Sequence, residues 1–76
     1  MTSPIRNTIR ELRADRSMTQ QALADLIHVT RQTVIAIEGD KYSPSLEVAF
    51  RIAHVFDVPL EQIFQYAPPR PRPRRK

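Results

Sequence analysis

The stretch Thr19–Gly39, TQQALADLIHVTRQTVIAIEG, decides the fold, because it reads as two short helices joined by a tight turn. Thr19 can cap a helix over about Gln20–Ile27, and Thr30 can cap a second over about Arg31–Glu38. The apolar residues fall where two helices that cross at a large angle would each bury one face. These apolar residues are Leu23, Ile27, Val29, Val34 and Ile37.

The first turn of the second helix carries side chains that hydrogen-bond to base edges and phosphates. Arg31 can grip guanine with two hydrogen bonds, Gln32 can hold adenine, and Thr33 suits a phosphate or a thymine methyl group. Ala36, one turn later, can offer only a methyl contact. Ile35 either touches a thymine methyl group or packs against the edge of the first helix, and the packing is favoured. The alternative for the polar set is a solvated helix face.

A longer run of residues carries a resemblance to a known family. TRQT at 30–33, KYSPSLE at 41–47 and VPLEQIF at 58–64 make the chain resemble the Cro/phage-repressor-type (Xre family) helix-turn-helix transcriptional regulators over about Ile5–Phe64. The nearest group is the small, single-domain bacterial and phage regulators. The resemblance implies an all-α, five-helix, lambda-repressor-like DNA-binding domain over residues 1–66, with the helix-turn-helix at about 19–39.

The resemblance also assigns roles to individual residues. Gln20 holds the place of a glutamine that contacts the DNA backbone, and a helix N-terminus attracts phosphate. Arg13 and Glu38 hold the places of a structural ion pair that links the first helix of the domain to the end of the second helix of the motif. The loop before the next helix flanks the other side of the groove. The expected phosphate contacts are Gln20, Thr30, Lys41, Tyr42, Ser43 and Ser45.

Two positions depart from the family pattern. His28 stands in the turn between the two helices, where the family usually has a glycine with positive φ, so we expect a left-handed and strained histidine. Gly39 and Asp40 replace the usual Asn-Gly pair after Glu38, which puts in doubt any backbone contact carried by the asparagine. We expect Gly39 to be the left-handed cap of the helix.

The remaining chain predicts three more helices and no sheet. Ser3-Pro4 favours a helix over about 4–15, Ser45 caps one over about 46–56, and Pro59 opens a short one to about Tyr66. No period-2 alternation is long enough for a strand. The 46–56 and 60–66 helices carry more apolar residues than one stripe needs. We expect a symmetric homodimer through them, the alternative being that the small domain covers them unaided.

The charge of the chain is concentrated at its C-terminus. Removing the five charges of the last seven residues from the net charge of +4 leaves residues 1–69 at −1. Residues 67–76 form a Pro/Arg-rich tail that we expect to be disordered. The tail is a phosphate-tracking or minor-groove arm, a solubilising end, or a proline-rich ligand for a protein groove. Its charged residues are Arg70, Arg72, Arg74, Arg75 and Lys76.

Several classes of function are disfavoured. The chain has no cysteine, and His28 and His54 lie far apart on different elements, so we expect no metal, no cofactor and no enzyme activity. No signal peptide or membrane span is visible, which favours a cytoplasmic protein. The resemblance implies a bacterial or phage origin. The sequence therefore predicts a DNA-binding regulator, most simply a repressor on a two-fold operator. The alternatives are an antitoxin with a toxin partner, a restriction controller, or a protein-interaction module.

Overall fold

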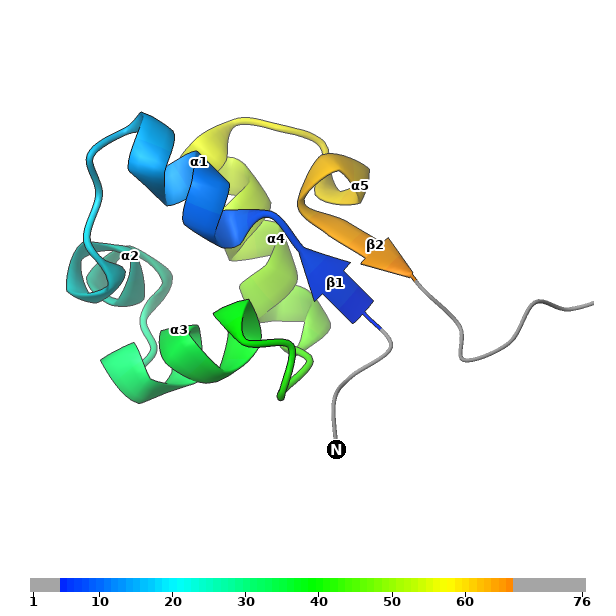
Figure 1. Ribbon diagram of the computed structural model, residues 1–76, viewed down its shortest axis with the longest axis horizontal. Coiled ribbons are helices and arrows are strands. Elements are labelled where there is room, and N and C mark those ends of the chain that lie inside the picture. The colour runs from blue at the N-terminus through cyan, green and yellow to red at the C-terminus, as the bar shows by residue number, and fades with distance from the viewer. Residues whose placement is uncertain (1–4, 67–76) are drawn as a thin grey trace, which may run out of the picture.

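The computed structural model describes residues 5–66, which form five helices and two short strands. Figure 1 shows α2 and α3 on one side of the domain, α4 behind α1, and the two strands side by side on the other. This is the mainly helical domain that the sequence predicts. In chain order the elements are β1 (Ile5–Asn7), α1 (Ile9–Asp15), α2 (Gln20–Ile27), α3 (Arg31–Glu38), α4 (Leu46–Phe56), α5 (Leu60–Ile63) and β2 (Phe64–Tyr66).

The three longest helices begin at side-chain caps. The hydroxyl oxygen of Thr19 accepts a hydrogen bond from the backbone N–H of Ala22. Thr30 and Ser45 make the same contact with the residue three positions later. Each cap satisfies one of the backbone donors that a helix start leaves without a partner. The predicted bounds of α2, α3 and α4 are confirmed.

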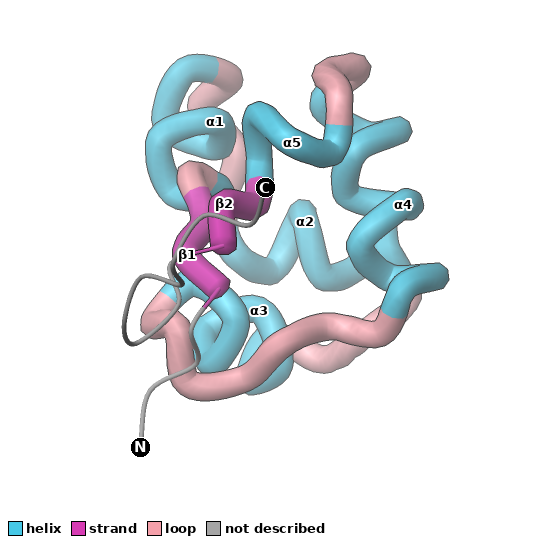
Figure 2. Tube along the Cα trace, turned by 90° about the vertical axis from the view of Figure 1, so that its right-hand side faces the viewer, coloured by secondary structure: helices cyan, strands magenta, loops and turns pink. Residues whose placement is uncertain are grey.

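The two ends of the described chain pair as a β-ribbon, which the sequence did not predict. β1 and β2 are antiparallel, with Ile5 opposite Tyr66 and Asn7 opposite Phe64 (Figure 2). The predicted helix over 4–15 is therefore wrong before Ile9, and the predicted helix to Tyr66 is wrong after Ile63. The suggested start at Ser3-Pro4 lies outside the described residues.

The hydrogen bonds around Asn7 explain why α1 begins late. The side-chain oxygen of Asn7 accepts from the backbone N–H of Ile9 at 3.1 Å, which starts the helix there. The backbone N–H of Thr8 donates to the carbonyl of Ile63 at 3.0 Å, and the Thr8 hydroxyl donates to the carbonyl of Gln62. The residues before Ile9 thus satisfy their backbone groups with the other end of the chain.

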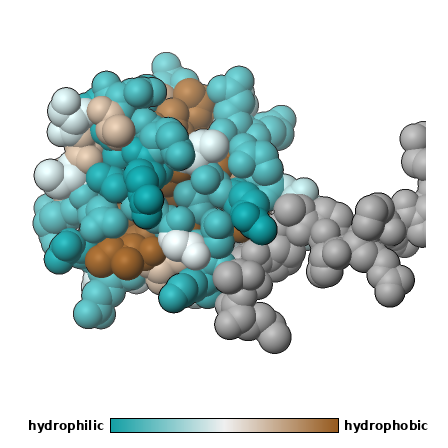
Figure 3. Space-filling model, in the orientation of Figure 1, coloured by the Kyte–Doolittle hydropathy of each residue, from teal (hydrophilic) through white to brown (hydrophobic). Residues whose placement is uncertain are grey.

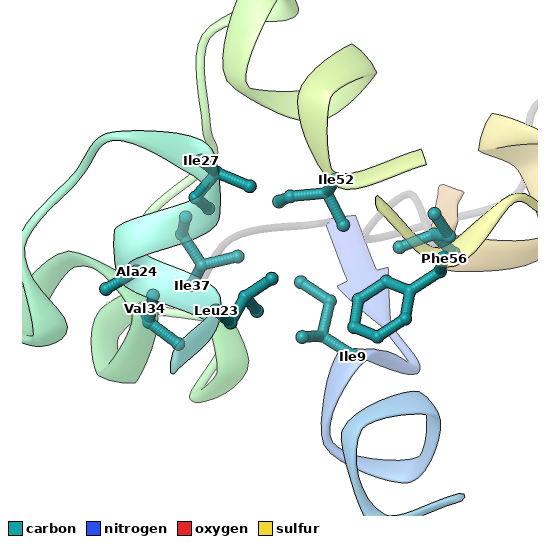
Figure 4. Packing of buried hydrophobic residues seen from close by; sticks show 9 residues of the cluster. Ile9, Leu23, Ala24, Ile27, Val34, Ile37, Ile52 and Phe56 are labelled. Atoms are coloured by element: carbon teal, nitrogen blue, oxygen red, sulfur yellow. The ribbon is translucent and has the colours of Figure 1, made fainter. Parts of the chain in front are cut away.

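One hydrophobic core joins all five helices. Figure 4 shows the side chains of α2 and α3 pointing toward those of α1 and α4, with Phe56 beside Ile9. Arg16 closes the end of α4, because its guanidinium donates to the carbonyl of Phe56 at 2.8 Å and lies 5.1 Å from the centre of the ring. The buried cluster is Ile9, Leu23, Ala24, Ile27, Val34, Ile37, Ile52, Phe56 and Ile63.

Left-handed backbone occurs where helices end. His28 has a φ of 63°, as the sequence predicts, and caps α2. The prediction for Gly39 is wrong, because its φ is −84° and the left-handed residue is Asp40, at 60°. A Cβ on Gly39 would meet its nearest atom, the carbonyl oxygen of Ile35, at an ordinary 3.4 Å. The strained position in this turn is thus held by an aspartate and not by the glycine beside it.

Candidate nucleic-acid interface

The orientation of α3 is fixed by the residues that it buries. Val34 and Ile37 are almost fully buried against α2 and the core. Because residues follow one another at about 100° around a helix, Gln32 lies opposite these two residues and Arg31 lies at the flank of the buried face. Both side chains are exposed to solvent. Neither side chain has a hydrogen-bond or ion-pair partner within residues 5–66, so both are available to a ligand.

The remaining polar residues at the start of α3 are hydrogen-bonded to each other. The hydroxyl groups of Thr30 and Thr33 lie 3.0 Å apart, and the backbone N–H of Thr33 donates to Thr30. Thr30 is exposed and Thr33 is half-buried. The two threonines therefore satisfy each other within the first turn, and Arg31 and Gln32 remain as its exposed polar side chains without a partner in the described chain.

A charged cluster ties α1, α2 and α3 together. The Arg13 Nε donates to Glu38 Oε2 at 2.5 Å, and its Nη2 donates to Oε1 at 3.0 Å, so the pair is bidentate. The third donor of Arg13, Nη1, binds the carbonyl of Met18 at 2.8 Å. Gln20 completes the cluster by donating from Nε2 to Glu38 Oε1 at 3.2 Å. The expected ion pair is thus present, and the predicted phosphate ligand Gln20 is part of the same network.

The burial of this pair shows what it does. The Glu38 side chain is only 1% exposed and that of Arg13 14%. The hydrogen bond to Glu38 raises the pKa of Arg13, more than burial lowers it, so the guanidinium stays charged. Both carboxylate oxygens of Glu38 have partners, which a buried charge requires. The pair holds the end of α3 against α1, and Gln20 extends the contact to the start of α2.

Asn7 positions the loop after α3, a role that the sequence analysis missed. Its amide nitrogen donates to the carbonyl of Ile37 at 2.7 Å and to the carboxylate of Asp40 at 3.0 Å. The backbone N–H of Lys41 then donates to the carbonyl of Ala36. These bonds fix the left-handed Asp40 where the chain leaves the helix. No sequence signal pointed to this role, because the predicted helix over 4–15 included Asn7.

The predicted phosphate residues of this loop lie on the surface beyond Asp40. Lys41, Tyr42 and Ser43 are exposed, and 50% of Tyr42 is open to solvent. Ser45 is also exposed, but its hydroxyl already accepts from the N–H of Val48 as the cap of α4. The loop follows the C-terminal end of α3, whereas Arg31 and Gln32 lie at the N-terminal end of the same helix.

Two grooves lie on either side of α4. One, of about 220 Å³, is apolar and runs between α4, α5 and the β-ribbon, where Leu46 is 68% exposed. The other, of about 480 Å³, lies between α2 and α4, and both histidines, His28 and His54, line it together with Glu47. Among residues 5–66, no group of three acidic, histidine or cysteine side chains is placed to hold a metal ion.

Residues 5–66 include no helix of the length and apolarity that crossing a membrane requires. The basic tail lies outside the described residues.

Three comparisons place this geometry among known proteins. The helix-turn-helix family model matches residues 9–63. An HTH-type transcriptional regulator of Methanocaldococcus jannaschii is 48% identical over 62 residues, which cover 82% of this chain and 94% of the relative. The CTXphi transcriptional repressor RstR of Vibrio cholerae is 34% identical over 72% of this chain and half of its own. The restriction-modification controller protein C.AhdI from Aeromonas hydrophila has a TM-score of 0.66 at 28% identity, covering 71% of this chain and 82% of the controller.

Proposed function

We propose that this chain, which belongs to the helix-turn-helix family of DNA-binding transcriptional regulators, reads a specific double-stranded sequence by placing α3 in the major groove. The observation that carries this proposal is the first turn of α3. Arg31 and Gln32 are exposed and without partners in the described chain, on a helix that Val34, Ile37 and Glu38 fix from behind. Hydrogen-bond donors presented on a helix that is fixed in this way are what base recognition requires.

Phosphate contacts would hold the helix in register. One N–H of the Gln20 amide binds Glu38, and the second remains to donate to a phosphate beside the N-terminus of α2. Lys41 and Tyr42 would grip the backbone on the other side of the groove, from the loop that Asn7 positions. Thr30, Ser43 and Ser45 add hydroxyl groups along the same edges. Such contacts supply affinity and orientation but no direct sequence information.

A homodimer through α4 and α5 would match a two-fold operator. The apolar groove beside α4 and the exposed Leu46 offer surface that a second copy can bury. The Leu46 side chain is open to solvent in the monomer, so Leu46→Lys should leave the helical content unchanged. Light scattering should then report the mass of one chain instead of two, and a mass unchanged from the wild-type dimer would place the interface elsewhere.

The regulatory role that we propose first is repression of transcription. A protein with this role would act in the cytoplasm, where bacterial DNA lies. A repressor among the relatives favours this role. The likeness to a restriction-modification controller favours a second candidate, control of a neighbouring nuclease operon. The two are distinguished by the gene beside this one and by whether the selected operator lies in that gene's promoter.

The basic tail would add salt-sensitive affinity, since residues 1–69 carry a net charge of −1. Deleting residues 68–76 should reduce the slope of log affinity against log salt by about 2–4 per chain and leave base preference nearly unchanged. If the salt slope is unchanged, the tail does not contact phosphates, and the solubilising role is favoured.

The decisive experiment is selection of bound sequences from a random DNA pool, followed by the same selection with Arg31→Ala. We expect a two-fold motif from the wild type and the loss of preference at one guanine in each half-site from the variant. A pool that shows no enriched motif would overturn the proposal and favour the protein-interaction alternative.

A further inference from the structure

Ile35 is an apolar side chain on the exposed face of α3. It is 43% exposed, and it is the one large hydrophobic residue of this helix that is open to solvent. Figure 3 shows a hydrophobic patch over α3 surrounded by hydrophilic surface. The expectation that Ile35 packs against the edge of α2 therefore accounts for only part of the side chain.

The position of Ile35 on the helix brings it next to the proposed base-reading residues. Four residues after Arg31, it lies about 40° around the helix from it and about 60° from Gln32. It lies about 6 Å further along the helix axis than Arg31, at a rise of 1.5 Å per residue. Base pairs follow one another at about 3.4 Å, so 6 Å corresponds to about two base-pair steps.

We propose that Ile35 is a specificity-determining residue that contacts the C5-methyl group of a thymine within about two base pairs of the guanine bound by Arg31. The inference rests on the proposed function. Thymine is the one base with a methyl group in the major groove, so an apolar side chain there distinguishes it from cytosine without a hydrogen bond. An isoleucine cannot serve a phosphate, and its exposure is otherwise unfavourable.

The surroundings favour DNA over a protein partner as the occupant. The patch on α3 is one side chain with Arg31 and Gln32 beside it, whereas protein-binding patches are contiguous areas of several hundred Å². Within residues 5–66, the other exposed large hydrophobic residues lie on α2, on α4, in the loop after α3 and at the end of β2. They are Leu26, Tyr42, Leu46, Phe50 and Tyr66.

The test removes one methyl group at a time from the DNA. Each thymine of the selected operator is replaced by uracil, and affinity is measured for the wild type and for Ile35→Ala. For the wild type, we expect about fourfold weaker binding when one particular thymine, within two base pairs of the Arg31-dependent guanine, becomes uracil. For Ile35→Ala, the same replacement should have no effect. Leu26→Ala, a matched change at an exposed residue of α2, should keep the wild-type penalty.

The outcomes separate this inference from the function on which it rests. If an operator is selected and depends on Arg31, but no uracil replacement weakens binding, Ile35 does not read a methyl group. The same conclusion follows if Ile35→Ala keeps the penalty. If no operator is selected at all, the proposed function fails and this inference fails with it. Thermal unfolding of Ile35→Ala checks that the variant is folded.

Discussion

The two sides of the domain differ in the polar groups that they expose, although Ile35 of α3 and Leu26 of α2 are also open to solvent. At the α2–α3 side, the outward residues Arg31 and Gln32 are polar and have no partners within the described chain. At the side of α4 and the β-ribbon, Leu46 is 68% exposed at an apolar groove, and Tyr66 of β2 is 70% exposed. Hydrogen-bond donors without partners suit a ligand that offers acceptors. Burial of exposed apolar surface against another protein lowers the free energy of the system. This contrast supports the proposed division of the domain into a nucleic-acid face at α3 and an assembly face at α4.

The two sides are also held together differently. The α2–α3 side depends on a charged cluster of side chains around Glu38. The ribbon side depends on backbone hydrogen bonds between the ends of the chain, to which α1 is attached through Thr8. Asn7 connects the two, because it lies in β1 and binds both Ile37 and Asp40 at the end of α3.

The largest expected effect comes from breaking the charged cluster. Arg13→Met should lower the free energy of unfolding by about 3 kcal/mol, because Glu38 would remain buried without its partner. The double change Arg13→Met/Glu38→Met should cost less than the single one. Urea denaturation measures both. Glu47→Gln, which removes the exposed pair with Arg51, is the control and should cost about 0.5 kcal/mol or less. Additive effects of the two methionines would show that the pair does not couple.

Arg31→Ala should affect the nucleic-acid face alone. Binding to the selected operator should weaken by about 1–3 kcal/mol. The free energy of unfolding should stay nearly unchanged, since the side chain is exposed and has no hydrogen-bond or ion-pair partner in the described chain. Fluorescence anisotropy with operator and with scrambled DNA separates specific from nonspecific loss. A variant that loses affinity equally for both would identify Arg31 as a phosphate ligand.

Asn7→Ala tests the connection between the two sides. We expect a loss of about 2 kcal/mol in stability, because the carbonyl of Ile37 and the N–H of Ile9 lose a partner and Asp40 loses its support. In this background Asp40→Gly should restore part of the loss, since glycine adopts a φ of 60° without strain. In the wild type, the same change should be close to neutral. If Asp40→Gly changes the stability equally in both backgrounds, Asn7 does not stabilise the left-handed conformation of Asp40.

The smallest effect is expected at the turn between α2 and α3. His28→Gly should be neutral or stabilising by no more than about 1 kcal/mol, because relief of the left-handed strain is offset by a more flexible unfolded chain. Chemical denaturation measures it, and Gly39→Ala, at a negative φ, is the comparison without strain to relieve. A loss above 1 kcal/mol for His28→Gly would reveal a contact made by the imidazole.

The sequence predicts the α2–α3 side of the domain well and the β-ribbon side poorly. The caps Thr19 and Thr30 and the apolar spacing of α2 and α3 are local signals, so the helix-turn-helix has the expected bounds. The ribbon joins two strands of three residues from opposite ends of the chain, which is too short for an alternating pattern to appear. The preference for glycine in left-handed turns pointed to Gly39, whereas Asp40 takes that position with support from Asn7, a residue 33 positions away.

The candidate site was predictable in its residue types and not in its couplings. Arg31 and Gln32 are exposed on the predicted turn because helical periodicity alone places them there. That Gln20 shares a carboxylate with Arg13, and that Asn7 supports the turn at Asp40, depends on distances between separate elements. No local pattern encodes such contacts.

The pairing of Ile5 with Tyr66 brings the two ends of the described chain together through backbone hydrogen bonds. Closing a loop of that length has an entropic cost that only a nearly complete chain can offset, so the ribbon should be among the last elements to form during folding. A deletion that removes the residues of one strand leaves the other strand without its partner. Conversely, a linker that joins residues 5 and 66 would let new termini be opened in a surface loop with the core retained.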